Sequence, residues 1–115
     1  MGSKSSKRKS ITGDALQPCS MKPMTGYMRD GYCYGGPGDT GKHHVCAVMD
    51  KQFLDYTASQ GNDLRSVARS GDRWCLCEGR YMQAANAGKA PKVVKEATWS
   101  GVDSRVKKKI RALNG

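Results

Sequence analysis

Cys75 and Cys77 are the residues of this chain whose type and spacing are best suited to chemistry. They close the stretch 71–77, which begins with a turn and is predicted to continue as a strand. Side chains alternate between the two faces of a strand, so Cys75 and Cys77 point to the same side. Trp74 and Leu76 then point to the other side, where they can anchor a core. Two thiols on one strand face are what a metal site or a redox site would use.

Zinc is the cofactor that these residue types favour, because tetrahedral zinc takes Cys and His ligands. The predicted ligands are Cys46, Cys75, Cys77 and His43, with Cys19 and Cys33 as alternates. The chain has no paired C-x-x-C motif, the strongest sequence signal for zinc. Buried structural cysteines are therefore the favoured interpretation, and a zinc site and redox-active thiols are the alternatives.

The cysteine count indicates a compartment. Five cysteines, an odd number, with no apolar signal segment near the start, favour free thiols in a reducing, intracellular compartment over a disulfide framework. His43 and His44 could act as bases in a hydrolytic enzyme, but adjacent histidines in a turn-rich segment are more often solvated. The sequence leans toward a protein without catalytic activity.

Residues 36–42, Gly-Pro-Gly-Asp-Thr-Gly-Lys, fit the first seven places of the phosphate-binding loop pattern. The eighth place is His43 instead of the Ser or Thr that holds magnesium. Residues 44–49 are predicted to be a strand, whereas the motif requires a helix there. We therefore expect a glycine-rich turn and no nucleotide site.

The net charge of +10 is concentrated at the two ends of the chain. Such clusters of like charge are typical of segments that contact an anionic partner. The residues predicted to bind an anionic surface are Lys4, Lys7, Arg8, Lys9, Lys107, Lys108, Lys109 and Arg111. The opening Met-Gly-Ser-Lys-Ser-Ser also matches the N-myristoylation pattern, which predicts lipidation at Gly2 and, with the basic cluster, peripheral membrane binding. A solvated tail or a localisation signal fits the same residues.

These features make a non-catalytic binding or attachment module the leading functional prediction. It would dock on an anionic membrane surface or on a larger macromolecular complex, since no apolar run is long enough to span a membrane. Nucleic-acid binding through the basic ends is one alternative, because Lys and Arg contact phosphates without sequence preference. A cysteine-based zinc or redox protein is the other.

Hydropathy patterns and turn signals predict an α+β fold, or a small α/β one. Residues 1–12 are predicted to be a disordered basic tail, and residues 13–115 a single domain. Predicted strands at 43–49, 72–77 and 92–99 alternate with predicted helices at 50–60, 79–87 and 102–113, the last of them basic and amphipathic. Gly and Pro punctuate residues 13–42 too often for a long helix, so this segment is expected to pack over the sheet.

Several blocks of sequence, in this order, resemble one family of small proteins. The blocks are 17–20 (QPCS), 23–26 (PMTG), 29–31 (RDG), 45–49 (VCAVM), 53–54 (FL), 61–64 (GNDL) and 71–77 (GDRWCLC). Over roughly residues 15–99 the chain resembles the mostly bacterial family of uncharacterised proteins known as domain of unknown function twenty-two thirty-seven. The family has no established activity, so the resemblance implies no reaction and no cofactor. The basic ends lie outside the resemblance and favour an attachment role.

Overall fold

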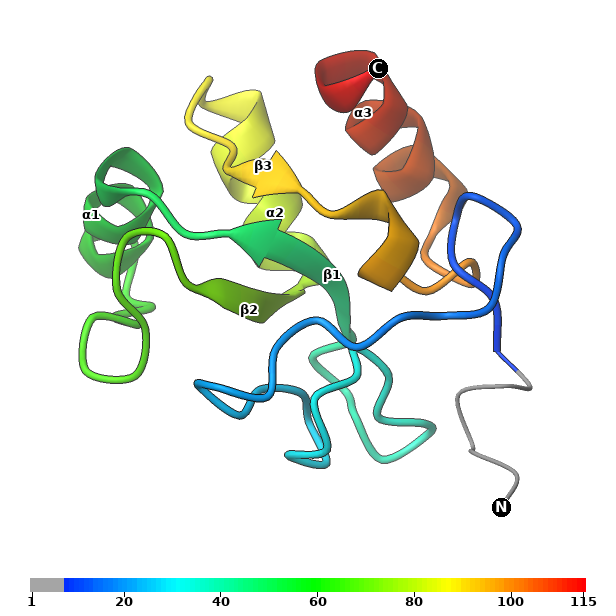
Figure 1. Cartoon of the computed structure of the whole chain (residues 1–115). Helices are drawn as coiled ribbons and strands as arrows, with labels where there is room; N and C mark the ends of the chain where they lie inside the picture. Colours follow the sequence, from blue (N-terminus) through cyan, green and yellow to red (C-terminus); the bar gives the residue numbers. More distant parts are fainter. Residues whose placement is uncertain (1–7) are drawn as a thin grey trace.

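The computed structural model describes residues 8–115 and has an α+β fold (Figure 1). Its elements, in chain order, are β1 (His43–Val48), α1 (Lys51–Ser59), β2 (Arg73–Cys77), α2 (Glu78–Asn86), β3 (Lys92–Val93), the 3-10 helix η2 (Lys95–Ala97) and α3 (Ser104–Asn114). The predicted fold class is confirmed. No helix in residues 8–115 is both long enough and apolar enough to cross a membrane.

β1 is the central strand of a three-stranded antiparallel sheet with the order β2-β1-β3. It pairs with β2 along its whole length, but with β3 only through Ala47 and Val48. β3 ends at Val93, whereas the sequence predicts a strand to residue 99, because the chain turns into η2. The hydroxyl of Thr98, just after η2, accepts a hydrogen bond from the backbone N–H of Cys46 (3.1 Å). A side chain thus replaces a strand partner at this edge of β1.

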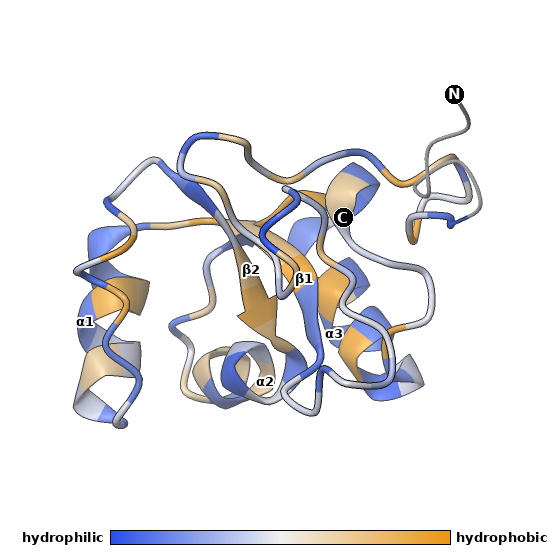
Figure 2. Cartoon of the chain, turned by 90° about the horizontal axis from the view of Figure 1, so that it is seen from below, coloured by the Kyte–Doolittle hydropathy of each residue, from blue (hydrophilic) through white to orange (hydrophobic). Residues whose placement is uncertain are grey.

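α2 and α3 cover one face of the sheet, α1 packs beside α2, and the main core lies between these helices and the sheet (Figures 1 and 2). The strand residues that alternate toward this face meet apolar residues of all three helices. Members of the cluster include Val45, Met49, Phe53, Leu54, Trp74, Leu76, Tyr81, Val106 and Ile110. Burial of this apolar surface is the main favourable contribution to folding. Trp74 and Leu76 are both buried, so their predicted role as core anchor is confirmed.

The helix ends follow the capping residues in the sequence. The side chain of Asp50 accepts the backbone N–H of Phe53 (2.7 Å) and begins α1 where predicted. α3 is amphipathic as predicted, with Val106 and Ile110 buried on its inner face. Leu113, predicted on the same face, is 55% exposed because it lies on the last turn, beyond the main core.

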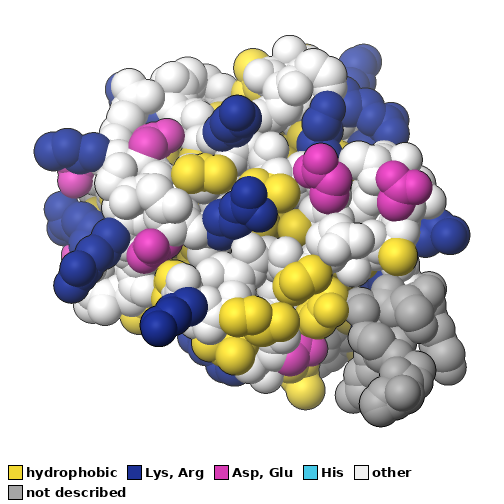
Figure 3. All heavy atoms as spheres, viewed as in Figure 1, with side chains coloured by type: hydrophobic (Ala, Val, Ile, Leu, Met, Phe, Trp, Pro, Cys, Tyr) yellow, Lys and Arg dark blue, Asp and Glu magenta, His cyan; other side chains and the backbone are white. Residues whose placement is uncertain are grey.

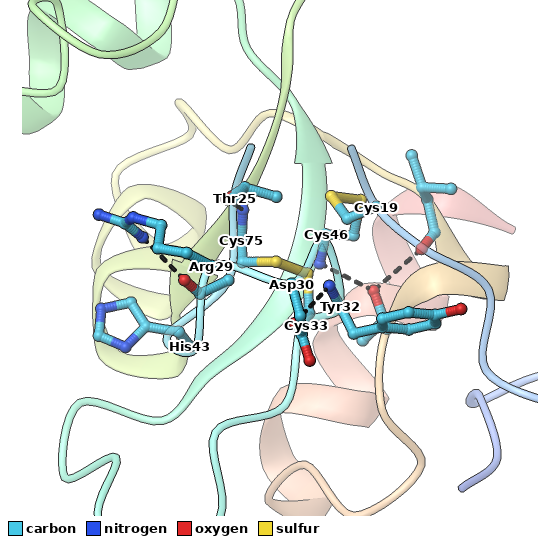
Figure 4. The surroundings of a disulfide bond; sticks show 12 residues. Cys19, Thr25, Arg29, Asp30, Tyr32, Cys33, His43, Cys46 and Cys75 are labelled. Carbon is cyan, nitrogen blue, oxygen red and sulfur yellow. Dashed lines mark hydrogen bonds between the residues drawn. A yellow bond between two sulfur atoms is a disulfide. The ribbon is translucent and has the colours of Figure 1, made fainter. Parts of the chain in front are cut away.

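The other face of the sheet is covered by loops and turns of residues 19–42 (Figure 2), whereas Ile11, earlier in the chain, packs in the main core. Two disulfides, Cys19–Cys46 and Cys33–Cys75, fasten this segment to the sheet (Figure 4). Cys46 and Cys75 are register partners on β1 and β2, yet each bonds to a loop cysteine. The four cysteines and Ala97 form a second, smaller core cluster. The predicted packing of this segment over the sheet is confirmed.

The prediction of five free cysteines is wrong. Within residues 8–115, which include all five, four cysteines are paired and Cys77 is the free one. The paired residues are 27 and 42 positions apart in the chain, and they meet only because the N-terminal segment folds over the sheet. Sequence spacing therefore gives no sign of either bond.

Residues 9–12, which the sequence assigns to a disordered tail, are bonded to the fold. Ile11 is buried, and its N–H donates to the carbonyl of Thr98 (3.0 Å). The carbonyl of Lys9 accepts the N–H of Ser100 (2.8 Å). The packed chain thus begins before residue 13. Residues 1–7 of the predicted tail, with Gly2, Lys4 and Lys7, lie outside the described residues.

Thiol counting tests the disulfides. Protein unfolded in denaturant without a reductant should expose one reactive thiol per chain, that of Cys77, because disulfide sulfurs do not react with thiol reagents. After reduction the count should rise to five. A count of five before reduction would contradict both disulfides.

Candidate active site

Cys77, the free cysteine, forms a chain of contacts with His43 and Asp39. The Sγ of Cys77 lies 3.1 Å from Nε2 of His43. The Nδ1–H of the same ring donates to Oδ1 of Asp39 over 2.6 Å. The side chain of Asp39 is fully buried, whereas that of His43 is 34% exposed and Cys77 is half-buried. Thiol, imidazole and carboxylate in this order are the arrangement in which a histidine activates a nucleophilic cysteine.

A β-bulge at the end of the sheet positions the histidine. From Val45 onward β1 pairs one-to-one with β2, but between Val45 and His43 it advances two residues while β2 advances one. The extra residue is His44. Without the bulge, alternation would turn His43 toward the same face as Val45, into the helix-covered core. The bulge places His43 opposite Cys77 instead.

The glycine-rich loop before β1 holds the carboxylate. The N–H of Asp39 donates to the carbonyl of Gly36 (3.0 Å), and its Oδ2 accepts the backbone N–H of His43 (2.7 Å). Gly35 packs so closely here that a Cβ on it would lie 2.7 Å from the Cβ of Asp39. The loop that resembles a phosphate-binding loop is therefore the support of Asp39, and it leads into a strand as predicted.

Contacts on both ring nitrogens raise the pKa of His43 from 6.5 to about 9. The hydrogen bond to Cys77 is the main cause; burial acts in the opposite direction, and the hydrogen bond to Asp39 adds to the rise. Burial also raises the pKa of Asp39, but hydrogen bonds from His43 and its charge outweigh burial and lower it overall. At neutral pH the ring is thus an imidazolium between a carboxylate and the sulfur. A positively charged group beside the sulfur is the environment in which reactive cysteines are found.

Cys77 is both the last residue of β2 and the N-cap residue of α2. The N–H of Glu78 donates to the carbonyl of Lys42 (3.0 Å), while those of Gly79 and Arg80 have no acceptor within the helix. An open pocket of about 530 Å³ lies at this helix end. Its lining residues are Thr40, Gly41, Lys42, Cys77, Glu78, Gly79, Arg80 and Gln83. Cys77 therefore lines a pocket at a helix N-terminus, where backbone N–H groups and a partial positive charge lie.

Gly41 keeps the sulfur accessible. A Cβ at this position would lie 2.9 Å from Cε1 of His43 and 3.3 Å from Sγ of Cys77, so any side chain would press on the pair. Gly38, in the same loop, has room for a Cβ, whose nearest neighbour would be the hydroxyl of Tyr27 at 3.8 Å. The two glycines are matched positions for testing access to the sulfur.

His44 pairs with Glu78 on the other side of the bulge. Its Nδ1–H donates to Oε2 of Glu78 (2.8 Å), and each side chain is 8% exposed. The other carboxylate oxygen accepts the N–H of Asp103 (3.2 Å) at the start of α3. The ring of Trp99 stands edge-on to that of His44, with the centroids 4.8 Å apart. This buried pair connects β1, α2 and α3 directly beside Cys77.

An exposed apolar patch borders the site. Figure 3 shows hydrophobic side chains gathered at the lower edge of one face, where the N-terminal loops lie in Figure 1. Its members on these loops are Met21, Met24, Tyr27 and Met28, each at least 44% exposed. The ring of Tyr27 stacks on that of His43, with centroids 6.1 Å apart and planes inclined by 24°. The patch thus reaches the edge of the Cys77–His43 pair.

The predicted zinc ligands fall into two separate groups. Cys46 and Cys75 are each bonded to a loop cysteine, while the other two predicted ligands form the thiol–imidazole pair. The Sγ atoms of the two alternates, Cys19 and Cys33, lie within 4.8 Å of each other and of that of Cys46. These sulfurs could hold a metal ion only after reduction, because the thiolate is the form that binds a metal.

The predicted anionic-surface residues do not form one group. The guanidinium of Arg8 lies over the ring of Tyr34, 3.9 Å from its centroid. Arg111 donates through Nη2 to the carbonyl of Ile11 (3.2 Å) and joins α3 to the N-terminal segment. The other described members are exposed or half-exposed: Lys9, Lys107, Lys108 and Lys109.

Asp39 is the residue of this candidate site that sequence reasoning missed. Its one signal is a carboxylate four positions before a histidine, at the exit of a glycine-rich loop. The odd cysteine count signals one unpaired thiol but does not say which cysteine carries it.

The titration of His43 tests the contacts within the triad of Cys77, His43 and Asp39. Because the hydrogen bond to Cys77 is the main cause of the raised pKa, replacing Cys77 by Ala should lower the pKa of His43 from about 9 toward 6.5 in an NMR titration. A raised folded-state pKa stabilises the protein fully below about pH 6.5, and this stabilisation is lost as the pH rises through about 9. In denaturant melts, the free energy of unfolding should therefore fall less between pH 6 and pH 9 in the Cys77→Ala variant than in the wild type. Equal His43 midpoints in the two proteins would contradict the contact.

Comparison with known proteins supplies a family and no activity. A search of curated proteins finds no match. The profile of a family described as uncharacterized protein conserved in bacteria matches residues 9–111. That span contains all three members of the triad, and it confirms the resemblance found in the sequence. The chain therefore belongs to this family, DUF2237.

Proposed function

We propose that the protein is a cysteine-dependent acyl-transfer or hydrolytic enzyme with Cys77 as its nucleophile. The observation that carries the proposal is the 3.1 Å contact of Cys77 Sγ with a His43 ring whose other nitrogen is held by buried Asp39. The proposal departs from the non-catalytic module that the sequence favours, because sequence patterns do not assemble these three residues.

The chemistry follows from the atoms in contact. The thiolate of Cys77 attacks the carbonyl carbon of an acyl substrate and forms a C–S bond. The bond to the leaving group then breaks, and the leaving group departs with the proton from Nε2 of His43. In hydrolysis, His43 next removes a proton from water, the resulting hydroxide attacks the thioester, and the C–S bond breaks. The products are a carboxylic acid and the protonated leaving group, and Cys77 and His43 return to their starting state.

The surrounding residues fit this sequence of steps. Asp39 fixes the ring so that Nε2 faces the sulfur, and its charge stabilises the imidazolium. The N–H groups of Gly79 and Arg80, on the first turn of α2, are candidate donors to the oxyanion that forms on the carbonyl oxygen. Gly41 and Gly79 place no side chain between the sulfur and an incoming carbonyl.

The pairing state of the cysteines favours acyl chemistry over dithiol redox chemistry. A dithiol mechanism needs a resolving thiol next to the nucleophile. In residues 8–115 the other four cysteines are held in disulfides and are nearly fully buried. The same disulfides support a working compartment in which disulfides persist, in place of the reducing one that the sequence favours.

Alkylation and acylation of Cys77 test the proposal. An ordinary thiol with a pKa near 8.5 is only about 1% thiolate at pH 6.5. Wild-type Cys77 should therefore react with iodoacetamide at pH 6.5 about 10- to 100-fold faster than Cys77 in the variant His43→Ala. p-Nitrophenyl acetate should acetylate Cys77, seen as an added acetyl group by intact mass, with release of p-nitrophenolate.

Matched variants separate access from folding. Gly41→Ala should lower both rates because its methyl group presses on the sulfur and the ring, whereas Gly38→Ala should leave them unchanged. Equal alkylation rates in wild type and His43→Ala would refute the activated cysteine. Fast alkylation without acetylation would refute the acyl chemistry and favour a redox thiol.

The outer side of α3 supports a second proposal, attachment to an anionic surface. Within residues 8–115, Lys107, Lys108 and Lys109 have no ion-pair partner. Because each lysine near an anionic membrane contributes about 1 kcal/mol, replacing all three by Gln should weaken binding to phosphatidylserine vesicles at least about tenfold in a sedimentation assay. Vesicles of neutral lipid are the control, and unchanged binding to the anionic vesicles would contradict this role for α3.

A further inference from the structure

The pocket beside Cys77 indicates a class of substrate, an inference that rests on the proposed function. We propose that the substrate carries an anionic group, a carboxylate or a phosphate, which Lys42 and Arg80 bind beside the reacting carbonyl. Both residues line the 530 Å³ pocket that contains the sulfur. Anion recognition of this kind would select small polar acyl compounds.

The pocket is lined by glycines and by residues whose side chains end in polar groups. Apart from the sulfur, the lining consists of glycines and of polar or charged side chains, with no large apolar or aromatic residue. Pockets for apolar ligands are lined mostly by hydrophobic and aromatic side chains. The groups that can distinguish ligands in this pocket are therefore the polar ends of its lining side chains.

The charges available in the pocket are positive. Its one acidic residue, Glu78, is buried, with Oε2 bonded to His44 and Oε1 bonded to the N–H of Asp103. Arg80 uses Nη1 for the carbonyl of Gln60 (3.0 Å) and for the side chain of Gln83 (3.3 Å). Its Nη2 and Nε groups have no protein acceptor in residues 8–115. An anion can therefore bind the guanidinium without displacing these contacts.

Lys42 is held in place by its backbone. Its φ of 54° lies in the left-handed region, which residues other than glycine seldom adopt. Its carbonyl accepts the N–H groups of both His44 (2.8 Å) and Glu78 (3.0 Å). Within residues 8–115 its Nζ has no hydrogen bond or ion pair, and the residue also lines two smaller adjoining pockets of about 370 and 360 Å³. The backbone thus holds Lys42 at a position where the residue lines all three pockets.

The N-terminus of α2 also favours an anionic ligand over a neutral one. The first turn of α2 carries a partial positive charge at the place where Cys77, Lys42 and Arg80 meet. The ring of His43 adds a further positive charge, with its Nε2 3.1 Å from the sulfur. An anionic electrophile is therefore attracted to Cys77 more strongly than a neutral one of the same size.

Two alkylating reagents of nearly equal size test the inference. Iodoacetate is anionic and iodoacetamide is neutral, and both alkylate the thiolate with loss of iodide. The quantity measured is the rate constant for iodoacetate divided by that for iodoacetamide at Cys77, at pH 7 and low salt. Relative to the wild type, this ratio should fall about threefold in Lys42→Met and about threefold in Arg80→Gln. It should fall by more in Lys42→Glu than in Lys42→Met. The ratio in the wild type should also fall at high salt, because salt screens exposed charges. Lys108→Met, on α3 and outside the pocket, should leave the ratio unchanged.

The outcomes separate the two proposals. Fast alkylation by both reagents, with a ratio that neither Lys42 variant changes, overturns the anionic substrate and leaves the activated cysteine standing. Slow alkylation by both reagents at the rate of an ordinary thiol overturns the proposed function and this inference with it. Because Lys42 is an exposed side chain, its variants test the inference even if Arg80→Gln, which loses contacts to Gln60 and Gln83, folds poorly.

Discussion

The antiparallel pairing of β1 with β2 is the interaction on which the rest of the structure depends. Its register sends Trp74 and Leu76 to the helices and Cys46 and Cys75 to the N-terminal segment. Both core clusters are therefore built on the same pair of strands. The bulge at the end of this pairing forms the candidate site. It turns His43 toward Cys77 and turns His44 toward the buried carboxylate of Glu78. A one-residue slip would separate every one of these partners.

The two disulfides hold the N-terminal segment on one face of the sheet, whereas apolar packing holds the helices on the other face. Within residues 8–42 the chain has only isolated bridges, so no ladder of backbone hydrogen bonds fixes its position. Crosslinks that close loops of 27 and 42 residues remove conformational freedom from the unfolded chain, worth roughly 3–4 kcal/mol each in the loop-entropy account. The loop that carries Asp39 runs from Cys33, bonded to β2, to the start of β1. Anchoring at both ends allows a segment without regular structure to hold a fully buried carboxylate.

Local sequence patterns correctly predicted the buried face of β2 and the start of α1. Alternation over 73–77 placed Trp74 in the core, and Asp50 marked the start of α1, because a strand face and a helix cap are set by neighbouring residues. The site depends on contacts that such patterns do not carry. Alternation alone directs His43 into the core, and only the bulge, a property of two strands together, brings it to Cys77. The disulfide pairs and the burial of Asp39 likewise depend on how a loop crosses the sheet, which no periodicity encodes.

The resemblance of residues 36–42 to a phosphate-binding loop shows how the same physical elements can be assembled differently. In that motif the lysine begins a helix whose N-terminus faces the anion. Here the chain after Lys42 continues as β1, so the motif is absent in its sequential form. The N–H of Glu78 nevertheless donates to the carbonyl of Lys42, which brings the lysine to the N-terminus of a different helix, α2. Residue 77, just before that helix, is the cysteine whose Sγ lies 3.1 Å from Nε2 of His43. A cation, a helix N-terminus and a nucleophile thus meet through the tertiary fold, and their combination favours chemistry on an anionic acyl compound over nucleotide binding.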